Sequence, residues 1–174
     1  MVEIHQLTLP ETYTIRRAVL YPNGPEAKIH IPNDEQGIHL GAWIHQRDGG
    51  PDTSSIPSAV PGISRMILVT TISLFRESLP SHLTRLLPTY DSKKSFRFRK
   101  FACLESYQGR GFGTKVLEHV FEIARRDPEF GPGSVVWCDA RRSTQGWYLR
   151  RGMKTIGEVF FKGDIEYIVM AIQI

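Results

Sequence analysis

A glycine-rich turn is the segment of this sequence whose residue types are best suited to chemistry. Glycine occupies positions 109, 111 and 113, between a strand pattern and a helix pattern that runs to Arg126. Glycine has no Cβ, so the backbone can curl tightly here and a ligand can approach it closely. The first N–H groups of a helix have no helical partner, and the helix dipole favours negative charge beside them. We therefore expect residues 108–114 to form an anion-binding site.

The spacing of these glycines separates the turn from two other phosphate-binding turns. A Walker loop ends in Gly-Lys-Ser/Thr, and a dinucleotide-binding turn has the pattern G-x-G-x-x-G with an acidic residue about 20 positions later. Here glycine recurs at every second residue. The segment Gln108-Gly109-Arg110-Gly111-Phe112-Gly113 instead resembles the Q/R-x-x-G-x-G/A signature of the GNAT N-acetyltransferase superfamily, whose turn holds the pyrophosphate of acetyl-CoA.

The flanking patterns predict the elements that position the turn. Apolar alternation and β-branched runs predict strands at 2–9, 38–46, 66–75, 96–104 and 134–140, and a closing hairpin of 155–161 and 165–174. Helical spacing predicts helices over 10–20, 81–88 and 112–126, and Ser143 is placed to cap a further helix that ends at Gly152. Residues 26–37 are expected to form a polar loop. This order of elements indicates an α/β (α+β) fold with a mixed sheet.

The helix predicted after the turn is amphipathic. Most of its charged residues lie outside an apolar stripe, which comprises Phe112, Val116, Val120, Ile123 and Ala124. The pair Asp127-Pro128 ends the helix. The strand that follows, 134–140, is mostly apolar, which is typical of strands buried on both faces.

Length and composition indicate one globular domain. A chain of 174 residues fits a single domain, 1–174, and 41% hydrophobic residues allow a core without disulfides. Cys103 and Cys138 lie in apolar runs, so we expect reduced, buried thiols in an intracellular protein. No apolar run approaches the ~18 residues of a membrane span, and the N-terminus lacks the apolar core of a signal peptide. These features predict a cytoplasmic location, with the nucleus also open.

Basic residues gather just before the glycine turn, in a chain whose formal net charge is +4. The cluster comprises Lys93, Lys94, Arg97, Arg99 and Lys100, interleaved with Phe96, Phe98 and Phe101. Three interpretations stay open from the residues alone. The cluster is the solvated face of an alternating strand, or it contacts nucleic-acid phosphates while the aromatics stack on bases, or it attracts the phosphates of coenzyme A to the neighbouring turn.

The second half of the chain, 96–174, resembles a GNAT domain in its order of elements and in its motifs. The strongest match is the block RKFACLESYQGRGFG at 99–113, and WYLRRGM at 147–153 stands where many members have FYxxxGF. Shorter matches are similar to the small ElaA-like branch: RRAVLYP at 16–22, HLGA at 39–42, GEVF at 157–160 and IEYIVM at 165–170. Residues 46–63 and 76–95 match no pattern of the family, so we expect them to be loop insertions.

The resemblance implies a GNAT-like acyl-CoA N-acyltransferase fold: a central twisted mixed sheet, flanked by helices, with a V-shaped splay between the fourth and fifth strands. The pantetheine arm of acetyl-CoA lies in that splay, and its pyrophosphate lies on the glycine turn. An extended backbone suits the amide-rich arm, and converging N–H groups suit a diphosphate. The implied cofactor-binding residues are Phe101, Ala102, Cys103, Gln108, Gly109, Arg110, Gly111, Phe112, Gly113 and Thr114.

Tyr148 matches the tyrosine of the family motif, which lies near the sulfur of coenzyme A. The resemblance therefore implies that Tyr148 is catalytic and donates a proton to the departing thiolate. A thiol of pKa about 8.5 and a phenol of pKa about 10 make such a transfer feasible at neutral pH. The residues alone favour a core aromatic that packs beside Trp147.

The sequence departs from the family pattern on the side of the acceptor. Some members carry a glutamate where this chain has Arg97, and an arginine cannot accept the proton of the attacking amine. Many members also have asparagine where this chain has Arg141. Three carboxylates are candidates for the general base: Glu105, Glu77 and Asp34. Each is nevertheless expected to be a solvated surface charge. The general base and the acceptor stay undetermined.

Two further residue types carry no predicted chemistry. A mid-strand cysteine such as Cys103 is expected to be a small core residue rather than an acyl-accepting nucleophile. The histidines, at positions 5, 30, 39, 45, 82 and 119, show no metal-ligand spacing, so no metal is predicted.

The sequence thus predicts an enzyme, an acyl-CoA-dependent N-acyltransferase that moves an acetyl group from acetyl-CoA to a primary amine by direct attack. The alternatives are a CoA-binding or nucleic-acid-binding module without turnover, and a structural protein whose glycine turn is only a tight connection. The predicted partners are acetyl-CoA and an unidentified amine, with no membrane and no nucleic acid, for a monomer or homodimer. The insertions are expected to govern the acceptor, and 76–95 packs either as a lid or into the core through Leu83, Leu86 and Leu87.

Overall fold

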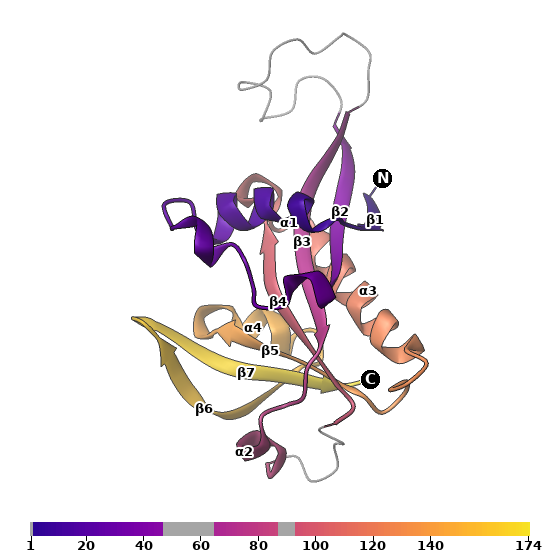
Figure 1. The fold of residues 1–174 in the computed structure, drawn as a ribbon, viewed down its shortest axis with the longest axis vertical. Helices are drawn as coiled ribbons and strands as arrows, with labels where there is room; N and C mark the ends of the chain where they lie inside the picture. The colour runs from indigo at the N-terminus through magenta and orange to yellow at the C-terminus, as the bar shows by residue number, and fades with distance from the viewer. Residues whose placement is uncertain (1, 47–64, 87–92) are drawn as a thin grey trace. The chain divides into compact units, whose positions relative to one another are not determined.

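The computed structural model describes residues 2–46, 65–86 and 93–174 (Figure 1). Two compact units are distinguished. The first unit comprises Met1–Ile72 and Lys100–Leu117, and the second unit comprises Ser73–Arg99 and Glu118–Ile174. The insertion expected at 46–63, apart from Gln46, and the predicted lid residue Leu87 lie outside the described residues. The expectation of a single domain remains a prediction.

Within the described residues, seven strands form one mixed sheet in the order β1-β2-β3-β4-β5-β7-β6. The strands are β1 (Val2–Gln6), β2 (Ile38–Gln46), β3 (Arg65–Arg76), β4 (Ser95–Cys103), β5 (Val135–Arg141), β6 (Lys154–Lys162) and β7 (Ile165–Gln173). The α-helices of the same residues are α1 (Leu9–Ile15), α2 (Ser81–Thr84), α3 (Phe112–Arg126) and α4 (Gln145–Leu149). The predicted mixed sheet with flanking helices is therefore confirmed.

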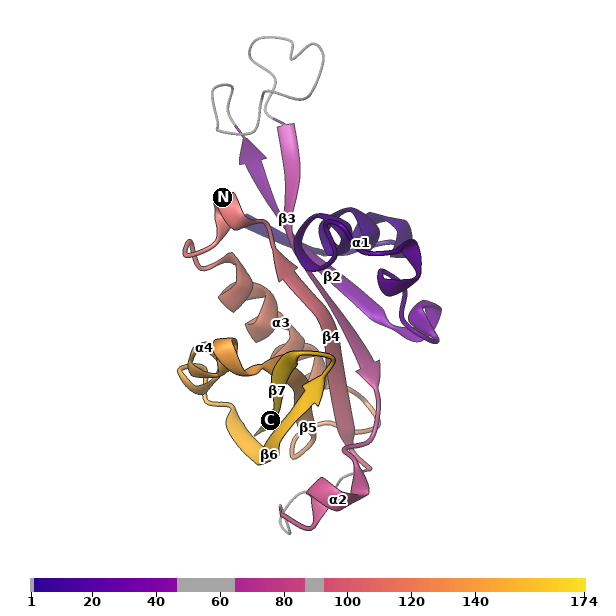
Figure 2. The ribbon, with the colours of Figure 1, turned by 90° about the vertical axis from the view of Figure 1, so that its left-hand side faces the viewer.

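Helix α1 of the first unit begins close to the position that the sequence predicts. Pro10 lies in its first turn, where the missing N–H of proline costs nothing. The carboxylate of Glu11 accepts the backbone N–H of Thr8 at 2.7 Å, which caps the start of the helix. A π-helical turn, Arg16–Leu20, continues the helix. Figures 1 and 2 show α1 beside β2, with which it makes contact.

The polar loop predicted at 26–37 is wrong in part, because the first unit buries several of its side chains. Ile29, Ile31 and Asp34 are 0%, 7% and 3% exposed, and two short 3₁₀ turns order the segment. The guanidinium of Arg16, itself fully buried, donates to the carbonyl of Ile29 at 3.0 Å and to Asp34 at 2.5 and 2.9 Å. A carboxylate can be buried here because a charged partner from the preceding helix meets it.

The second unit contains the closing hairpin that the sequence predicts. β6 and β7 pair antiparallel, and β7 pairs antiparallel with β5 from Val135↔Gln173 to Arg141↔Tyr167. The apolar core beside these strands comprises Leu79, Leu83, Val135, Trp137, Ile156, Val169 and Ala171. Since Leu79 and Leu83 come from the segment 76–95, this expected insertion contributes to the core.

The fourth and fifth strands pair over a short length only. β4 and β5 are parallel, and their register covers Ser95↔Val135 to Arg97↔Trp137. Both strands continue past this register, to Cys103 and to Arg141. The pairing of β4 with β5 therefore ends at Arg97, before the end of either strand.

The helix after the glycine turn has its predicted bounds, but its buried stripe and the start of the next helix differ from the prediction. α3 covers the predicted range, but Leu117 and Phe121 are also buried, so its buried stripe is wider than expected. The prediction that Ser143 caps the next helix is wrong. Ser143 lies inside a 3₁₀ turn whose Thr144 hydroxyl donates to a backbone carbonyl at 2.8 Å, and α4 begins only after it. Gly152, expected at the helix end, has a φ of +80° and follows α4 by three residues.

Candidate active site

The glycine turn of the first unit has the backbone geometry of an anion-binding loop. Gly109 and Gly111 have φ angles of +74° and +83°, in the left-handed region that glycine adopts without strain. Apart from the adjacent residues in the chain, no heavy atom of the described residues lies within 4 Å of the place that a Cβ would occupy at either glycine. Helix α3 begins at Phe112, and the amide of Lys115 makes its first turn with the carbonyl of Gly111 at 3.1 Å. The space in front of the helix is thus open to a ligand.

Side chains of the same segment fix the turn against the end of β4. The amide nitrogen of Gln108 donates to the carbonyl of Cys103 at 3.0 Å. The guanidinium of Arg110 lies over the ring of Tyr107, 5.3 Å from its centroid, and Tyr107 is buried. The first turn of α3 contains no acidic residue. The start of α3 therefore combines the positive charge of Arg110 with a backbone that is held in one conformation.

The strand residues expected along the pantetheine arm adjoin the turn in sequence and lie in the same unit. Ala102 is buried, and Phe101 and Cys103 are half-buried. Burial is the largest influence on the Cys103 thiol and raises its pKa. The thiol is therefore protonated at neutral pH, which fits the expected core role better than that of a nucleophile. All the predicted cofactor-binding residues lie between β4 and the first turn of α3 in the first unit.

Tyr148 lies in the second unit, on α4, where it is 8% exposed. Its ring packs against Phe98 and Trp147, at centroid distances of 6.0 and 5.0 Å. Burial, together with the interaction with Cys138, raises the pKa of Tyr148 well above 10. The hydroxyl therefore stays protonated at physiological pH. Core packing is confirmed, whereas the proton-donor role stays a prediction.

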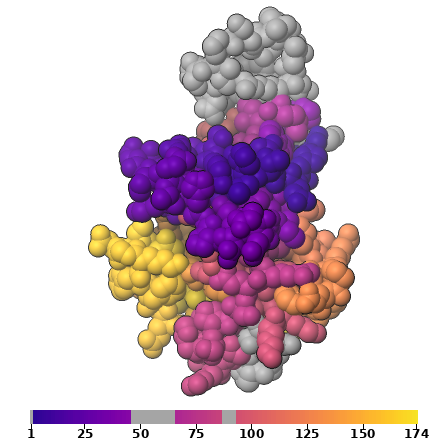
Figure 3. Space-filling model, in the orientation of Figure 1, coloured from indigo at the N-terminus to yellow at the C-terminus, as the bar shows by residue number. Residues whose placement is uncertain are grey.

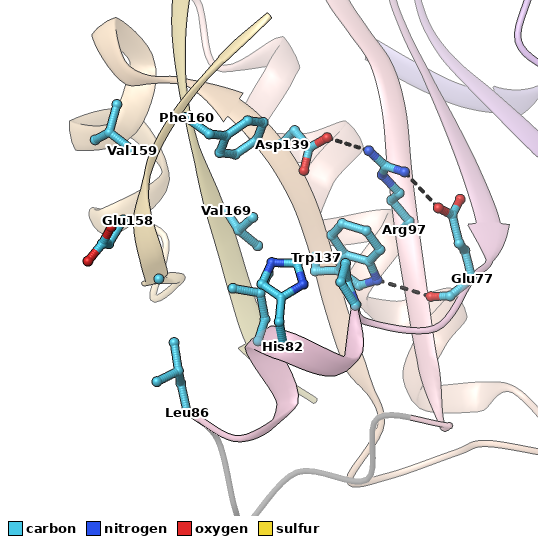
Figure 4. Close-up of a pocket in the computed structure, with 13 residues that line it drawn as sticks. Glu77, His82, Leu86, Arg97, Trp137, Asp139, Glu158, Val159, Phe160 and Val169 are labelled. Atoms are coloured by element: carbon cyan, nitrogen blue, oxygen red, sulfur yellow. Dashed lines mark hydrogen bonds and ion pairs between the residues drawn. The ribbon is translucent and has the colours of Figure 1, made fainter.

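The opposite face of β4 and β5 carries an ion-pair network that the sequence did not predict. Because side chains alternate along a strand, Trp137 and Asp139 face away from Cys138. Arg97 donates to the carboxylate of Glu77 at 2.6 Å and to that of Asp139, and it lies 4.5 Å from the centroid of the Trp137 indole (Figure 4). The indole N–H in turn donates to the carbonyl of Glu77 at 3.0 Å. Arg97 is therefore held rigidly rather than displayed to solvent.

The other basic residues of β4 are also engaged, so the interpretation of this strand as a solvated face is wrong. Arg99 donates to Glu77 at 2.5 Å, and Lys100 donates to the hydroxyl of Tyr21 at 2.7 Å and to the carbonyl of Lys28 at 2.6 Å. The interleaved rings at 96 and 98 are 1% and 2% exposed, and cannot stack on bases. The rings at 96 and 98 therefore give the nucleic-acid interpretation no support.

A pocket of about 710 Å³ opens beside this network, and all of its lining belongs to the second unit. The volume is that of a small-molecule site. The lining combines apolar and charged side chains from α2 and its flanks, β4, β5, β6 and β7 (Figure 4): Glu77, Pro80, His82, Leu83, Leu86, Arg97, Trp137, Asp139, Gly157, Glu158, Val159, Phe160 and Val169.

Comparisons with known proteins agree with this architecture. No protein-family model matches the chain. An uncharacterized N-acetyltransferase of Bacillus subtilis, YitI, is 27% identical over 174 residues, which is 98% of this chain and 95% of YitI. Escherichia coli ElaA superposes with a TM-score of 0.63 and 16% identity over 98% of this chain and 99% of ElaA. The chain has the fold of the GNAT N-acetyltransferases.

Two further GNAT-fold structures similar to this chain were determined with ligands. Arabidopsis thaliana NAA60 in complex with a bisubstrate analogue has a TM-score of 0.68 and 12% identity, over 99% of this chain and 98% of NAA60. A Bacillus subtilis acetyltransferase in complex with CoA has a TM-score of 0.56 and 15% identity, over 99% and 97% of the two chains. Both structures share their fold with this chain.

The three carboxylates considered as the general base differ in their exposure to solvent. Glu105 is exposed, as expected. The expectation of a solvated charge is wrong for Asp34, which is buried against Arg16, and for Glu77, which binds two arginines. Sequence reasoning missed Asp139, although the alternation of β5 places it beside Trp137 on the face away from Cys138.

The described residues contain neither a metal-ligand cluster nor a membrane-spanning helix. No group of three or more His, Cys, Asp or Glu side chains in this part of the chain could hold a metal ion. None of the described helices is long and apolar enough to cross a membrane.

Proposed function

We propose that this chain transfers an acetyl group from acetyl-CoA to a primary amine by direct attack of the amine on the thioester. The observation that carries the proposal is the open glycine turn before α3, where Gly109 and Gly111 leave free the space that a Cβ would fill. A diphosphate fits such a turn, because converging N–H groups and the helix dipole bind anions. The similarity to YitI over nearly the whole chain supports the same activity.

The binding roles proposed for the first unit follow from backbone geometry. The N–H groups from Gly109 to Thr114 would surround the pyrophosphate. The hydrogen bond from Gln108 to the carbonyl of Cys103 and the contact of the Arg110 guanidinium with the Tyr107 ring would fix the turn. The extended backbone of Phe101–Cys103 would accompany the pantetheine arm as a neighbouring strand does.

The proposed chemistry needs one deprotonated amine and one proton donor. The neutral amine nitrogen attacks the thioester carbon, the C–N bond forms, and the C–S bond breaks with its electron pair on sulfur. Tyr148 is proposed to give its proton to that sulfur, and its raised pKa keeps the hydroxyl protonated before the transfer. The proton lost by the amine goes to water or to a carboxylate, and a proton returned from there to the Tyr148 oxygen restores the hydroxyl and the balance of charge.

The alternative without turnover predicts cofactor binding and no product. The buried rings at 96 and 98 argue against the nucleic-acid form of that alternative. The free thiols of Cys103 and Cys138 support a reducing compartment, so we place the protein in the cytoplasm, as a monomer or homodimer.

Two measurements on the same protein test the proposal. Calorimetry with acetyl-CoA measures binding, and release of free thiol across a panel of primary amines measures transfer. Binding together with amine-dependent thiol release supports the proposal, whereas binding without release from any amine would make the chain a CoA-binding module.

A further inference from the structure

The pocket beside Arg97 is built by a segment that follows β3 and by a distorted strand. The register of β6 against β7 shifts between Ile156 and Phe160, which marks a bulge in β6. Gly157 in this bulge has a φ of +71°, and a Cβ there would lie 2.7 Å from Leu83. The absence of that Cβ lets α2 close onto β6. We call residues 79–86, which include α2, the α2 segment. Figure 3 shows this segment and the yellow β6–β7 hairpin on the visible face of the second unit.

The two leucines of the α2 segment differ in how they meet this pocket. Leu83 is 6% exposed and belongs to the core with Trp137 and Val169. Leu86 is 57% exposed and lines the pocket at its surface. With Phe160 on the facing strand, these side chains give the pocket an apolar wall that suits an aliphatic or aromatic ligand.

Asp139 is one of the polar groups that line the pocket, together with Glu77, His82, Arg97 and Glu158. Its Oδ2 accepts from Arg97 and from Lys162, which hold the side chain in one position. Within the described residues no hydrogen bond reaches its Oδ1, and Figure 4 shows this oxygen turned toward the pocket. The carboxylate of Glu77, in contrast, is engaged by Arg97 and Arg99.

An open acceptor atom in the lining favours a cation. The carboxylates of Glu77 and Asp139 are paired with Arg97, and further with Arg99 and Lys162 respectively, while Figure 4 shows the carboxylate of Glu158 turned away from Arg97. Both terminal nitrogens of Arg97 already donate to carboxylates. An anionic ligand would meet the open oxygen of Asp139, whereas an ammonium group would find there a charge-assisted acceptor.

We infer that this pocket binds the acyl acceptor, and that the acceptor is a primary amine carried on an apolar or aromatic body. The ammonium lies against Oδ1 of Asp139, and the body lies between Leu86 and Phe160. This inference rests on the proposed function, because only an acyltransferase requires an acceptor. Asp139 is then a specificity-determining residue that selects a cation.

Calorimetry with three probes tests the chemistry of the pocket without turnover. Phenethylamine carries a ring and an ammonium, 3-phenylpropionate carries the ring and a carboxylate, and ethylamine carries the ammonium alone. We expect phenethylamine to bind about tenfold more tightly than either of the others, from the charge and from the buried ring. Binding of 3-phenylpropionate as tight as that of phenethylamine would overturn the inference.

Substitutions at Leu86 test the location of the site with little effect on the fold, because this side chain is mostly exposed. Leu86→Lys should weaken phenethylamine binding about threefold, and Leu86→Glu should keep or improve it, since the added charges repel or attract the ammonium. Ile165→Lys is the matched control, because Ile165 is 43% exposed in the same unit and does not line the pocket. Equal effects of Leu86→Lys and Leu86→Glu on phenethylamine affinity would show that the ammonium does not bind in this pocket.

Asp139→Asn keeps the shape of the side chain and removes its charge. We expect about a tenfold loss of phenethylamine affinity, with ethylamine weakened in the same proportion and 3-phenylpropionate improved. If loss of the bonds to Arg97 and Lys162 unfolds this variant, the Leu86 pair decides the question. If thiol release with amines occurs at the same rate in all these variants, the assignment of the acceptor to this pocket is wrong, whereas the proposed function stands. No thiol release with any amine would instead overturn the proposed function.

Discussion

The hydroxyl of Tyr148 and the thiol of Cys138 are hydrogen-bonding partners inside the second unit. Both side chains are buried, at 8% and 2% exposure. Burial is the largest cause that raises the pKa of each group well above its ordinary value. Neither group ionises near neutral pH, so the hydroxyl of Tyr148 keeps its proton there.

Tyr148→Phe is expected to lower kcat about a hundredfold and to leave the affinity for acetyl-CoA nearly unchanged. Phenylalanine keeps the packing against Phe98 and Trp147 and removes only the proton donor. Steady-state thiol release and calorimetry measure the two quantities. Cys138→Ser, which retains a hydrogen-bonding partner, is the matched control. An unchanged kcat in Tyr148→Phe would restrict this residue to a packing role.

Gly111→Val is expected to remove most of the rise in melting temperature that acetyl-CoA produces. A ligand that binds only the folded state stabilises it by mass action, and a side chain at Gly111 would enter the open space of the turn. Gly163→Val is the control for backbone strain, because Gly163 also has a positive φ, +61°, and open surroundings but lies outside the turn. A full acetyl-CoA shift in Gly111→Val would contradict the assignment of the pyrophosphate site.

Local sequence patterns predicted the elements of this protein well, because each depends on residues close in the chain. The proline near the start of α1 and the glycines before α3 act within one turn, and both elements begin within a residue or two of the predicted position. The cap assigned to Ser143 failed for a local reason, since a 3₁₀ turn precedes α4 and moves the cap to Thr144.

Pairings between distant residues could not be predicted from one sequence. Arg16 and Asp34 are 18 residues apart, and Arg97 and Asp139 are 42 residues apart. From the sequence alone, charged side chains such as these are expected to be solvated. Their partners become known only from the fold, which brings distant residues together. The pocket residue Asp139 was missed for this reason, while the glycine turn was found because its residues are contiguous.

His39 is expected to make the first unit less stable as pH falls below about 6.5. Burial lowers the pKa of His39, and the charge of Arg16 adds to this effect, although a hydrogen bond to the carbonyl of Asp34 opposes it. The unfolded chain therefore binds a proton at a higher pH than the folded chain does. The resulting stabilisation is complete above the ordinary pKa and declines as pH falls toward the folded value.

Urea unfolding between about pH 7.5 and pH 5.5 measures this dependence. His39→Gln places an amide near the position of Nε2, so it should flatten the decline in the free energy of unfolding. His5→Gln alters an exposed histidine and should leave the slope unchanged. Identical slopes for wild type and His39→Gln would show that another group causes the decline.

Leu83→Ala and Leu86→Ala are expected to separate the core role of the α2 segment from its surface role. Leu83 is buried in the core, so its truncation should cost about 2–5 kcal/mol of unfolding free energy. Leu86 is mostly exposed, so its truncation should cost less than about 0.5 kcal/mol. Chemical denaturation of the two variants provides the comparison. A large loss for Leu86→Ala would mean that the segment packs as core along its whole length.

The most direct test of the account is mass-spectrometric analysis of phenethylamine incubated with acetyl-CoA and the purified protein, with free thiol measured in parallel. The account predicts N-acetylated amine and free thiol in equal amounts. It also predicts that Gly111→Val slows both and that Gly163→Val slows neither. Thiol release without acetylated amine, or acetylated amine formed equally fast without the protein, would contradict the claim that this chain is an amine acetyltransferase.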